Sequence, residues 1–103
     1  MTILHVTTRE AWEAAQTAGE YRTPDIEKIG FIHFCRPDQL EFVLDRYFTG
    51  KTGLVVLHVN SNRLTADLKF ERSEPEQPPF PHLYGPLNLD AVESAVDVAK
   101  PPL

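Results

Sequence analysis

The sequence predicts a single α+β domain with two helices in its N-terminal half and a mixed or mainly antiparallel sheet. Two observations predict this class. Segments with strand-like and helical periodicity follow one another in the order β, α, β, α and then mainly strands. The 103 residues are the size of one domain, and no linker divides them. We therefore expect one domain over residues 1–103, in which 100–103 form a frayed tail.

The first strand and first helix have the clearest local signals. Alternation over residues 3–7 predicts a strand that places His5 and Thr7 on one face. Thr7 and Glu10 have the spacing of a capping box, and Gly19 is a helix stop signal, so a helix is predicted between them. Its apolar positions at helical spacing are Ala11, Ala14, Ala15 and Ala18.

A second strand and helix are predicted next. Residues 23–30 contain a proline and are expected to form a loop, and the β-rich run 31–35 predicts a strand that carries His33. Pro37 is suited to the first helical turn, and a helix is expected from there to about Gly50. Its expected core positions are Leu40, Val43, Leu44 and Tyr47.

The remaining segments favour strands. Residues 54–59 are apolar on both faces except at His58, which predicts a central strand. A strand is expected at 68–71, followed by a proline-rich loop at 73–81 that is typical of a lid or binding loop. Alternation over 92–98 predicts the last strand.

Composition excludes several classes of function. The net charge of −5 disfavours nucleic acid, whose binding depends on Lys and Arg contacts to phosphate. No segment approaches the roughly 20 apolar residues of a membrane helix. Cys35 is the only cysteine, so no internal disulfide forms, and no histidine pair has a spacing typical of a metal site. We expect a cytoplasmic monomer without a metal, whose partner is a small-molecule ligand.

Histidines are the first candidates for chemistry because they titrate near neutral pH. His5 and His33 both lie in predicted strands, and their rings converge on one cleft if those strands are neighbours. The alternative for each is a structural residue with satisfied hydrogen bonds. His58 ends an apolar strand, which favours a structural role. His82 lies in FPHLYGPL, where two prolines stiffen either a site wall or a structural corner.

Glu71 and Cys35 are two further candidates for catalytic groups. Glu71 ends a predicted strand beside the proline loop, where its carboxylate is either a base or a solvated surface group. Cys35 shares a strand face with His33, but a buried, unreactive thiol is favoured over a nucleophile.

Four segments resemble the domain-of-unknown-function 952 family: LHVTTREAWEAAQTAGEY, GFIHFC, LKFE and FPHLYGPLNLDAV. The last is the most specific match. This chain departs from the family pattern at Cys35, where serine is usual, which argues against an obligatory cysteine nucleophile. The family is similar to the ADP-ribosyltransferase-like fold, which includes the RNA 2'-phosphotransferases. The resemblance thus implies this fold, with NAD as a substrate and no other cofactor.

The resemblance also implies roles for single residues. His5 and Thr7 would hold the nicotinamide ribose of NAD, and His33 would line the nicotinamide pocket. The third position of the family's motif falls on Glu71, His82 or Tyr84. Candidate catalytic residues are therefore His33, Glu71 and His82, and candidate ligand-binding residues are His5, Thr7 and Tyr84.

Three functions remain open at this point. The first is an enzyme that acts at the N-glycosidic bond of NAD or of an ADP-ribosylated small molecule. The second is a noncatalytic domain that binds a nucleotide or another small ligand. The third is a structural partner domain that uses the apolar edge at 92–98.

Overall fold

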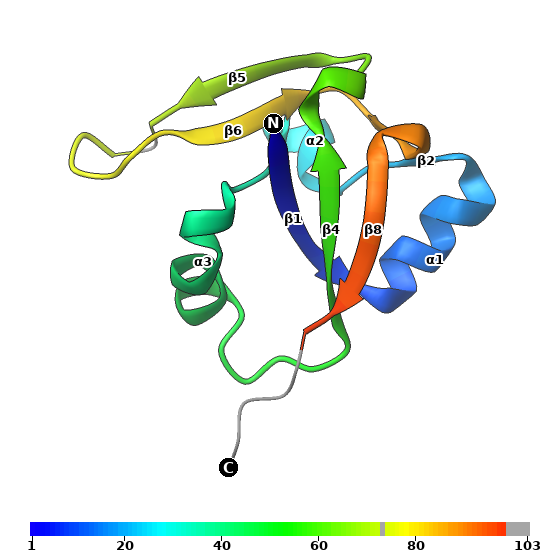
Figure 1. The fold of residues 1–103 in the computed structure, drawn as a ribbon, viewed down its shortest axis with the longest axis horizontal. Helices are drawn as coiled ribbons and strands as arrows, with labels where there is room; N and C mark the ends of the chain where they lie inside the picture. Colours follow the sequence, from blue (N-terminus) through cyan, green and yellow to red (C-terminus); the bar gives the residue numbers. More distant parts are fainter. Residues whose placement is uncertain (73, 99–103) are drawn as a thin grey trace.

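The centre of the fold is an antiparallel sheet of three strands, with the order β1 (Thr2–Thr8), β4 (Leu54–Asn60) and β8 (Val92–Asp97). It is seen in a computed structural model that describes residues 1–72 and 74–98. The predicted tail at 100–103 lies outside the described residues. β4 is the middle strand, as its two apolar faces predict (Figure 1).

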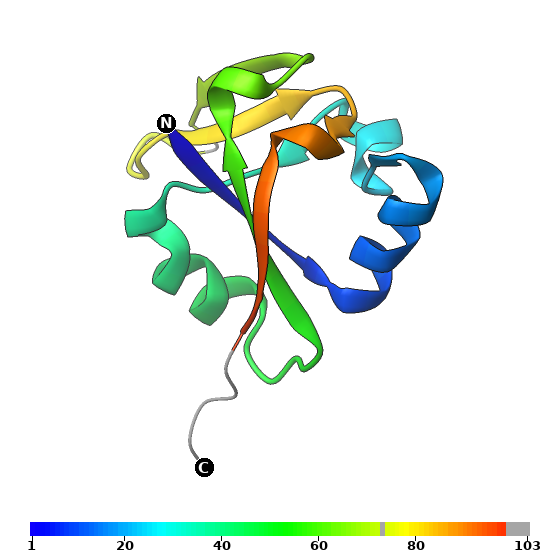
Figure 2. The ribbon, with the colours of Figure 1, turned by 45° about the vertical axis from the view of Figure 1, so that its right-hand side comes forward.

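Helices cover both faces of this sheet. α1 (Arg9–Ala18) packs Trp12 and Ala15 against one apolar cluster, which contains Ile3 of β1. α3 (Leu40–Tyr47) packs Val43 and its neighbours against a second cluster, which contains Leu4 of β1. The helices lie on opposite sides of the sheet (Figure 2). Alternate residues of β1 and β4 thus enter different clusters, and both clusters stabilise the domain by removing apolar surface from water.

The N-terminus of α1 differs from the prediction by one residue. Thr8 is the N-cap, and its side chain accepts a hydrogen bond from the Ala11 amide at 3.1 Å. Thr7 is not available as the cap because its hydroxyl contacts Tyr21. Gly19 ends the helix at φ +90°, as predicted.

A second antiparallel sheet crosses above the first one in Figure 1 and has the order β3 (Ile32–His33), β6 (Phe80–Tyr84) and β5 (Asp67–Glu71). The expected strand over 31–35 is therefore shorter than predicted. The sequence predicts a loop that ends at Pro81 and a site wall or a stiff corner around His82, but both segments belong to strand β6, so the loop is predicted too long and the strand is missed.

Pro81 explains how a proline fits inside the middle strand β6. Its carbonyl accepts a hydrogen bond from the Phe34 amide at 2.9 Å. Proline has no amide hydrogen, so Pro81 cannot donate a hydrogen bond in return. Phe34 lies just past the end of β3, so the missing bond falls at the end of the β3–β6 pairing and interrupts no hydrogen bond within it.

Several short elements escaped prediction. The strands β2 (Glu20–Tyr21) and β7 (Leu87–Asn88) pair with each other, and α2 (Asp25–Ile29) occupies most of the expected loop at 23–30. The 3-10 turns at Pro37–Gln39 and Leu89–Ala91 were not predicted either, whereas the turn at Ser61–Arg63 agrees with the short helical turn that the sequence predicts at 60–64. α3 follows the first of these turns, close to its predicted start.

Tyr47 of α3, a predicted core position, is 57% exposed. Val96 of β8 is 49% exposed. The register between β4 and β8 shifts between His58 and Val59, so simple alternation does not describe which residues of β8 face inward. Within the described residues, no helix is long and apolar enough to cross a membrane.

Candidate functional site

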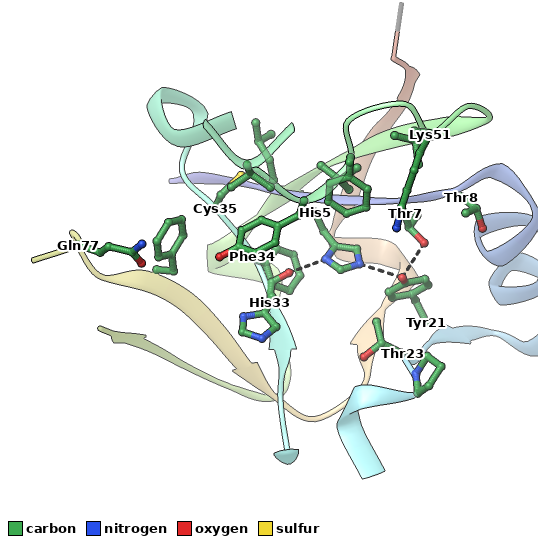
Figure 3. Close-up of a pocket in the computed structure, with 18 residues that line it drawn as sticks. His5, Thr7, Thr8, Tyr21, Thr23, His33, Phe34, Cys35, Lys51 and Gln77 are labelled. Atoms are coloured by element: carbon green, nitrogen blue, oxygen red, sulfur yellow. Dashed lines mark hydrogen bonds between the residues drawn. The ribbon is translucent and has the colours of Figure 1, made fainter. Parts of the chain in front are cut away.

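A cavity of about 520 Å³ lies beside β1, at the outer edge of the first sheet. On that edge the Leu4 amide and carbonyl exchange two hydrogen bonds with Cys35, each of 2.7 Å. Residues from both faces of β1 line the cavity, and α3 and the ends of β3 and β6 complete its wall (Figure 3). Its polar side chains are His5, Thr7, Thr8, Tyr21, Thr23, His33, Cys35, Tyr47, Lys51 and Gln77.

His5 is held at both ring nitrogens. Its Nδ1 lies 2.5 Å from the His33 carbonyl oxygen, and its Nε2 lies 2.8 Å from the Tyr21 hydroxyl. The same hydroxyl lies 2.8 Å from Oγ1 of Thr7. Figure 3 shows these three side chains and the His33 carbonyl in one chain of hydrogen bonds. The sequence-predicted residues His5 and Thr7 are thus coupled by Tyr21.

The charge of His5 decides the direction of these hydrogen bonds. Burial lowers the pKa of His5 from its usual value of 6.5 to about 4, so the ring is neutral at pH 7. A carbonyl only accepts, so Nδ1 carries the hydrogen and Nε2 accepts from Tyr21. Thr7 then donates to Tyr21. When His5 is protonated, both of its nitrogens donate, and Tyr21 donates to Thr7.

This ordering leaves few polar groups for a ligand. His5 and Tyr21 have their hydrogens committed within the protein. Thr7 keeps lone pairs on Oγ1, and the exposed ring of His33 lines the cavity. A ligand in the cavity therefore meets a hydroxyl acceptor and a solvent-accessible imidazole on the same wall.

The described lining of the cavity carries one positive charge, although the whole chain is acidic. Lys51 is the only lining residue with a permanent charge among those that the structure describes, and no carboxylate lines the cavity there. The whole chain has a net charge of −5. The Lys51 ammonium lies 5.5 Å from the centre of the Phe48 ring, which also lines the cavity. This charge pattern favours an anionic ligand.

The other predicted site residues form a cluster on the second sheet. Oε1 of Glu71 accepts a hydrogen bond from the Tyr84 hydroxyl at 2.5 Å and lies 2.9 Å from Nδ1 of His82. The Tyr84 bond first, and the His82 bond second, lower the pKa of Glu71 below its usual value. The carboxylate is ionised at neutral pH. The same hydrogen bond raises the pKa of Tyr84.

His33 connects this cluster to the cavity. It pairs with His82 across β3 and β6, and the two rings meet edge to face with centres 5.0 Å apart. Phe31 stacks on His82 with centres 4.1 Å apart and an interplanar angle of 17°. Lys69 lies opposite His82 in the register, with its ammonium 4.9 Å from the Tyr84 ring centre.

The structure thus divides the six predicted site residues into two groups. His5, Thr7 and His33 line one cavity, as their strand positions led us to expect. Glu71, His82 and Tyr84 are bonded to one another and do not line it. Prediction missed Tyr21, Phe31, Lys51 and Lys69. A buried tyrosine hydroxyl needs a partner, but nothing in the sequence shows that the partner of Tyr21 is His5.

The thiol of Cys35 and the question of a metal site also bear on the chemistry. Cys35 is buried, and burial raises the pKa of its thiol to about 11, so it is protonated at neutral pH. Among the described residues, no group of three or more His, Cys, Asp or Glu is placed to hold a metal ion.

Solved structures share this fold. Protein CC0527 of Caulobacter crescentus, solved by crystallography, is 32% identical and superposes with a TM-score of 0.84 over 94% of this chain and 85% of that chain. Its solution NMR structure gives 33% identity and a TM-score of 0.79 over 93% of this chain and 83% of that chain. No curated protein matches the sequence significantly. Residues 6–95 match the family described as "Protein of unknown function (DUF952)". The chain therefore belongs to the DUF952 family.

Proposed function

We propose that this protein binds a phosphate-bearing ligand with a planar heterocycle in the cavity beside β1 and acts on its N-glycosidic bond. NAD and ADP-ribosylated small molecules are the class that the resemblance to ADP-ribosyltransferase-like proteins implies. The observation that carries the proposal is the charge of the cavity, where Lys51 stands without any acidic neighbour in the described lining. A volume of about 520 Å³ is within the usual range of small-molecule sites.

Each part of such a ligand has a counterpart in the lining. The rings of Phe34 and Phe48 offer apolar contact to a heterocycle. Oγ1 of Thr7 can accept a hydrogen bond from a ribose hydroxyl, and Lys51 can pair with a phosphate. His33, exposed at the same wall, is placed to contact the ribose or the leaving ring.

Calorimetric titration with NAD and ADP-ribose tests binding. We expect saturable binding of both, with about 2.7 kcal/mol of added stability at 100 times the dissociation constant. Lys51→Ala should weaken binding roughly tenfold, the loss of one charged contact of about 1.4 kcal/mol. Lys28→Ala is the matched control because Lys28 is exposed on α2 and does not line the cavity. Equal affinities of the two variants would argue against the proposal.

The second candidate is a domain that binds the same ligand without turnover. It is favoured by the absence of a carboxylate from the described cavity lining, because glycosidic cleavage commonly uses carboxylates. Chromatography after long incubation with NAD separates the two. Release of nicotinamide supports the enzyme, and NAD recovered intact supports the binding domain.

We also propose that the protein works in the cytoplasm as a monomer whose main partner is this ligand. A single, buried, protonated cysteine supports an intracellular setting. Light scattering over a range of concentrations tests the monomer. A mass that rises with concentration would instead favour an interface, for which the exposed Val96 of β8 is one candidate position.

A further inference from the structure

Of the two ring nitrogens of His82, one lies within hydrogen-bond distance of a side chain of the described residues and the other does not. Its side chain is 5% exposed, and its Nδ1 lies 2.9 Å from Oε1 of Glu71. Its Nε2 is buried and has no hydrogen-bond partner among the residues that the structure describes. Buried polar atoms are usually paired, so a ring nitrogen that the described residues leave unpaired suggests a further partner, such as a bound ligand.

The bond to Glu71 fixes the tautomer of His82. The ionised carboxylate can only accept, so Nδ1 of His82 carries a hydrogen. In the neutral ring, Nε2 is then the basic atom. An imidazole that is oriented by a carboxylate, with its far nitrogen open, is the arrangement of a general base.

His82 adjoins the cavity through two neighbours. Side chains of β6 alternate, so Phe80 and His82 share a face, and Phe80 lines the cavity. His33 pairs with His82 across the sheet and lines the same cavity. The exposed ring of His33 meets the buried ring of His82 edge to face. His33 therefore contacts His82 and also lines the cavity.

We infer that Glu71 and His82 form the acid–base dyad of this site, and that Nε2 of His82 takes a proton from a hydroxyl group or water molecule in the cavity when the His33 side chain rotates away. The inference rests on the proposed function and names the base that it requires. In the step, the O–H bond breaks and its proton moves to Nε2, while the oxygen bonds to the anomeric carbon of the ligand. The C–N bond breaks, and its electron pair leaves with the heterocycle. Glu71 stabilises the imidazolium that results.

The surroundings of His82 suit this change of charge. Glu71 supplies the anion, and Tyr84 holds the same carboxylate oxygen in place. Lys69 lies across from His82 in the register of β5 and β6, and His33 faces it from β3. An imidazolium on His82 would be attracted by one carboxylate and repelled by Lys69 and by a charged His33.

The first test of the dyad removes Nε2 of His82 and keeps the hydrogen bond to Glu71. In His82→Asn, the amide nitrogen can replace Nδ1 as the donor to Glu71, but nothing replaces Nε2. Nicotinamide release from NAD should fall by about 100-fold or more, with the dissociation constant of NAD changed less than twofold. His82→Gln, which places an amide near the position of Nε2, should be equally inactive. Wild-type rates in either folded variant would overturn the inference.

Glu71→Gln tests the role of the carboxylate. Loss of the anion should move the acidic limb of the pH–rate profile to lower pH and lower the maximal rate. A profile that keeps its shape and only falls in amplitude would show that Glu71 is structural, and the dyad would be wrong.

A third measurement needs no ligand and separates this inference from the proposed function. Diethyl pyrocarbonate forms a bond to an accessible imidazole nitrogen and releases carbon dioxide and ethanol. His33→Ala should speed the modification of His82 several-fold, while His5, bonded at both nitrogens, stays unreactive. If His82 stays unmodified in His33→Ala, the inference is overturned whatever NAD does. If His82 responds but NAD neither binds nor reacts, the proposed function fails and the dyad is supported for another substrate.

Discussion

The carbonyl oxygen of His33 lies 2.5 Å from Nδ1 of His5, so the backbone of β3 sets the tautomer of a side chain on β1. His5 and His33 therefore have different roles in the cavity wall. His5 is a neutral, fixed part of the wall, and its hydrogen bonds order Tyr21 and Thr7. His33 presents its ring to the cavity and to His82.

Removal of the Tyr21 hydroxyl should destabilise the protein. Tyr21→Phe leaves Nε2 of His5 and Oγ1 of Thr7 without their shared partner in a buried setting. The free energy of unfolding should fall by about 1–3 kcal/mol. Urea unfolding measures it, with Tyr47→Phe as the control because Tyr47 is largely exposed. Equal effects of the two substitutions would contradict the described hydrogen-bond chain.

Stability should depend on pH through His5. Its pKa is about 4 in the folded protein and near 6.5 in the unfolded chain, so the unfolded state binds the proton first. The contribution of a neutral His5 is complete above pH 6.5 and is lost as pH falls from 6.5 toward 4, up to roughly 3 kcal/mol.

The comparison of wild type with His5→Asn isolates this effect. The variant keeps an amide donor for the His33 carbonyl but has no titrating group. The unfolding free energies at pH 7 and pH 4.5 should differ less in the variant than in the wild type. The same pH dependence in both proteins would show that His5 is not the titrating group.

Tyr84→Phe should change the titration of Glu71. The Tyr84 hydroxyl is the largest cause of the lowered pKa of Glu71, so its removal should raise that pKa toward its usual value. Stability linked to Glu71 is present above the unfolded pKa and is lost as pH falls through the folded one, so the variant should lose it at higher pH. Carboxyl-carbon NMR follows the residue directly. An unchanged Glu71 titration would mean that the Tyr84 bond is absent in solution.

Gly85→Ala should be destabilising for a steric reason. Gly85 follows Tyr84 at φ +155°, and a Cβ there would lie 2.8 Å from Cβ of Ala66. The cost should be about 1–3 kcal/mol. Gly53→Ala is the control because it also has positive φ but has open space around the added atom. If the two substitutions cost the same by thermal unfolding, backbone strain alone accounts for the loss.

The sequence predicted the elements whose formation depends on residues close together in the chain. The apolar run of β4 and the spacing of α1 locate these elements because burial on both faces and helical periodicity are visible in the chain. β2 and β7 were missed because each has two residues and exists only through its pairing with the other. β6 was missed because a proline inside a strand is tolerated here only by its position opposite the end of β3. That position depends on the tertiary structure and is not visible in the sequence.

In the candidate site, too, positions set by local patterns were predicted and contacts between distant segments were not. His5, Thr7 and His33 could be named because alternation places them on strand faces, and the resemblance to a family supported them. The contact of Tyr21 with His5 joins residues 16 positions apart and has no sequence pattern. The bond between Glu71 and His82 depends on strand β6, which the sequence does not predict as a strand.

The most direct test of the central claim is an amide NMR titration of the protein with ADP-ribose. We predict that the largest shift changes fall on Thr7, Tyr21, His33 and Lys51, that they saturate, and that Lys51→Ala weakens them while Lys28→Ala does not. Shift changes confined to other surfaces, or none at millimolar ligand, would contradict a ligand site in the cavity beside β1.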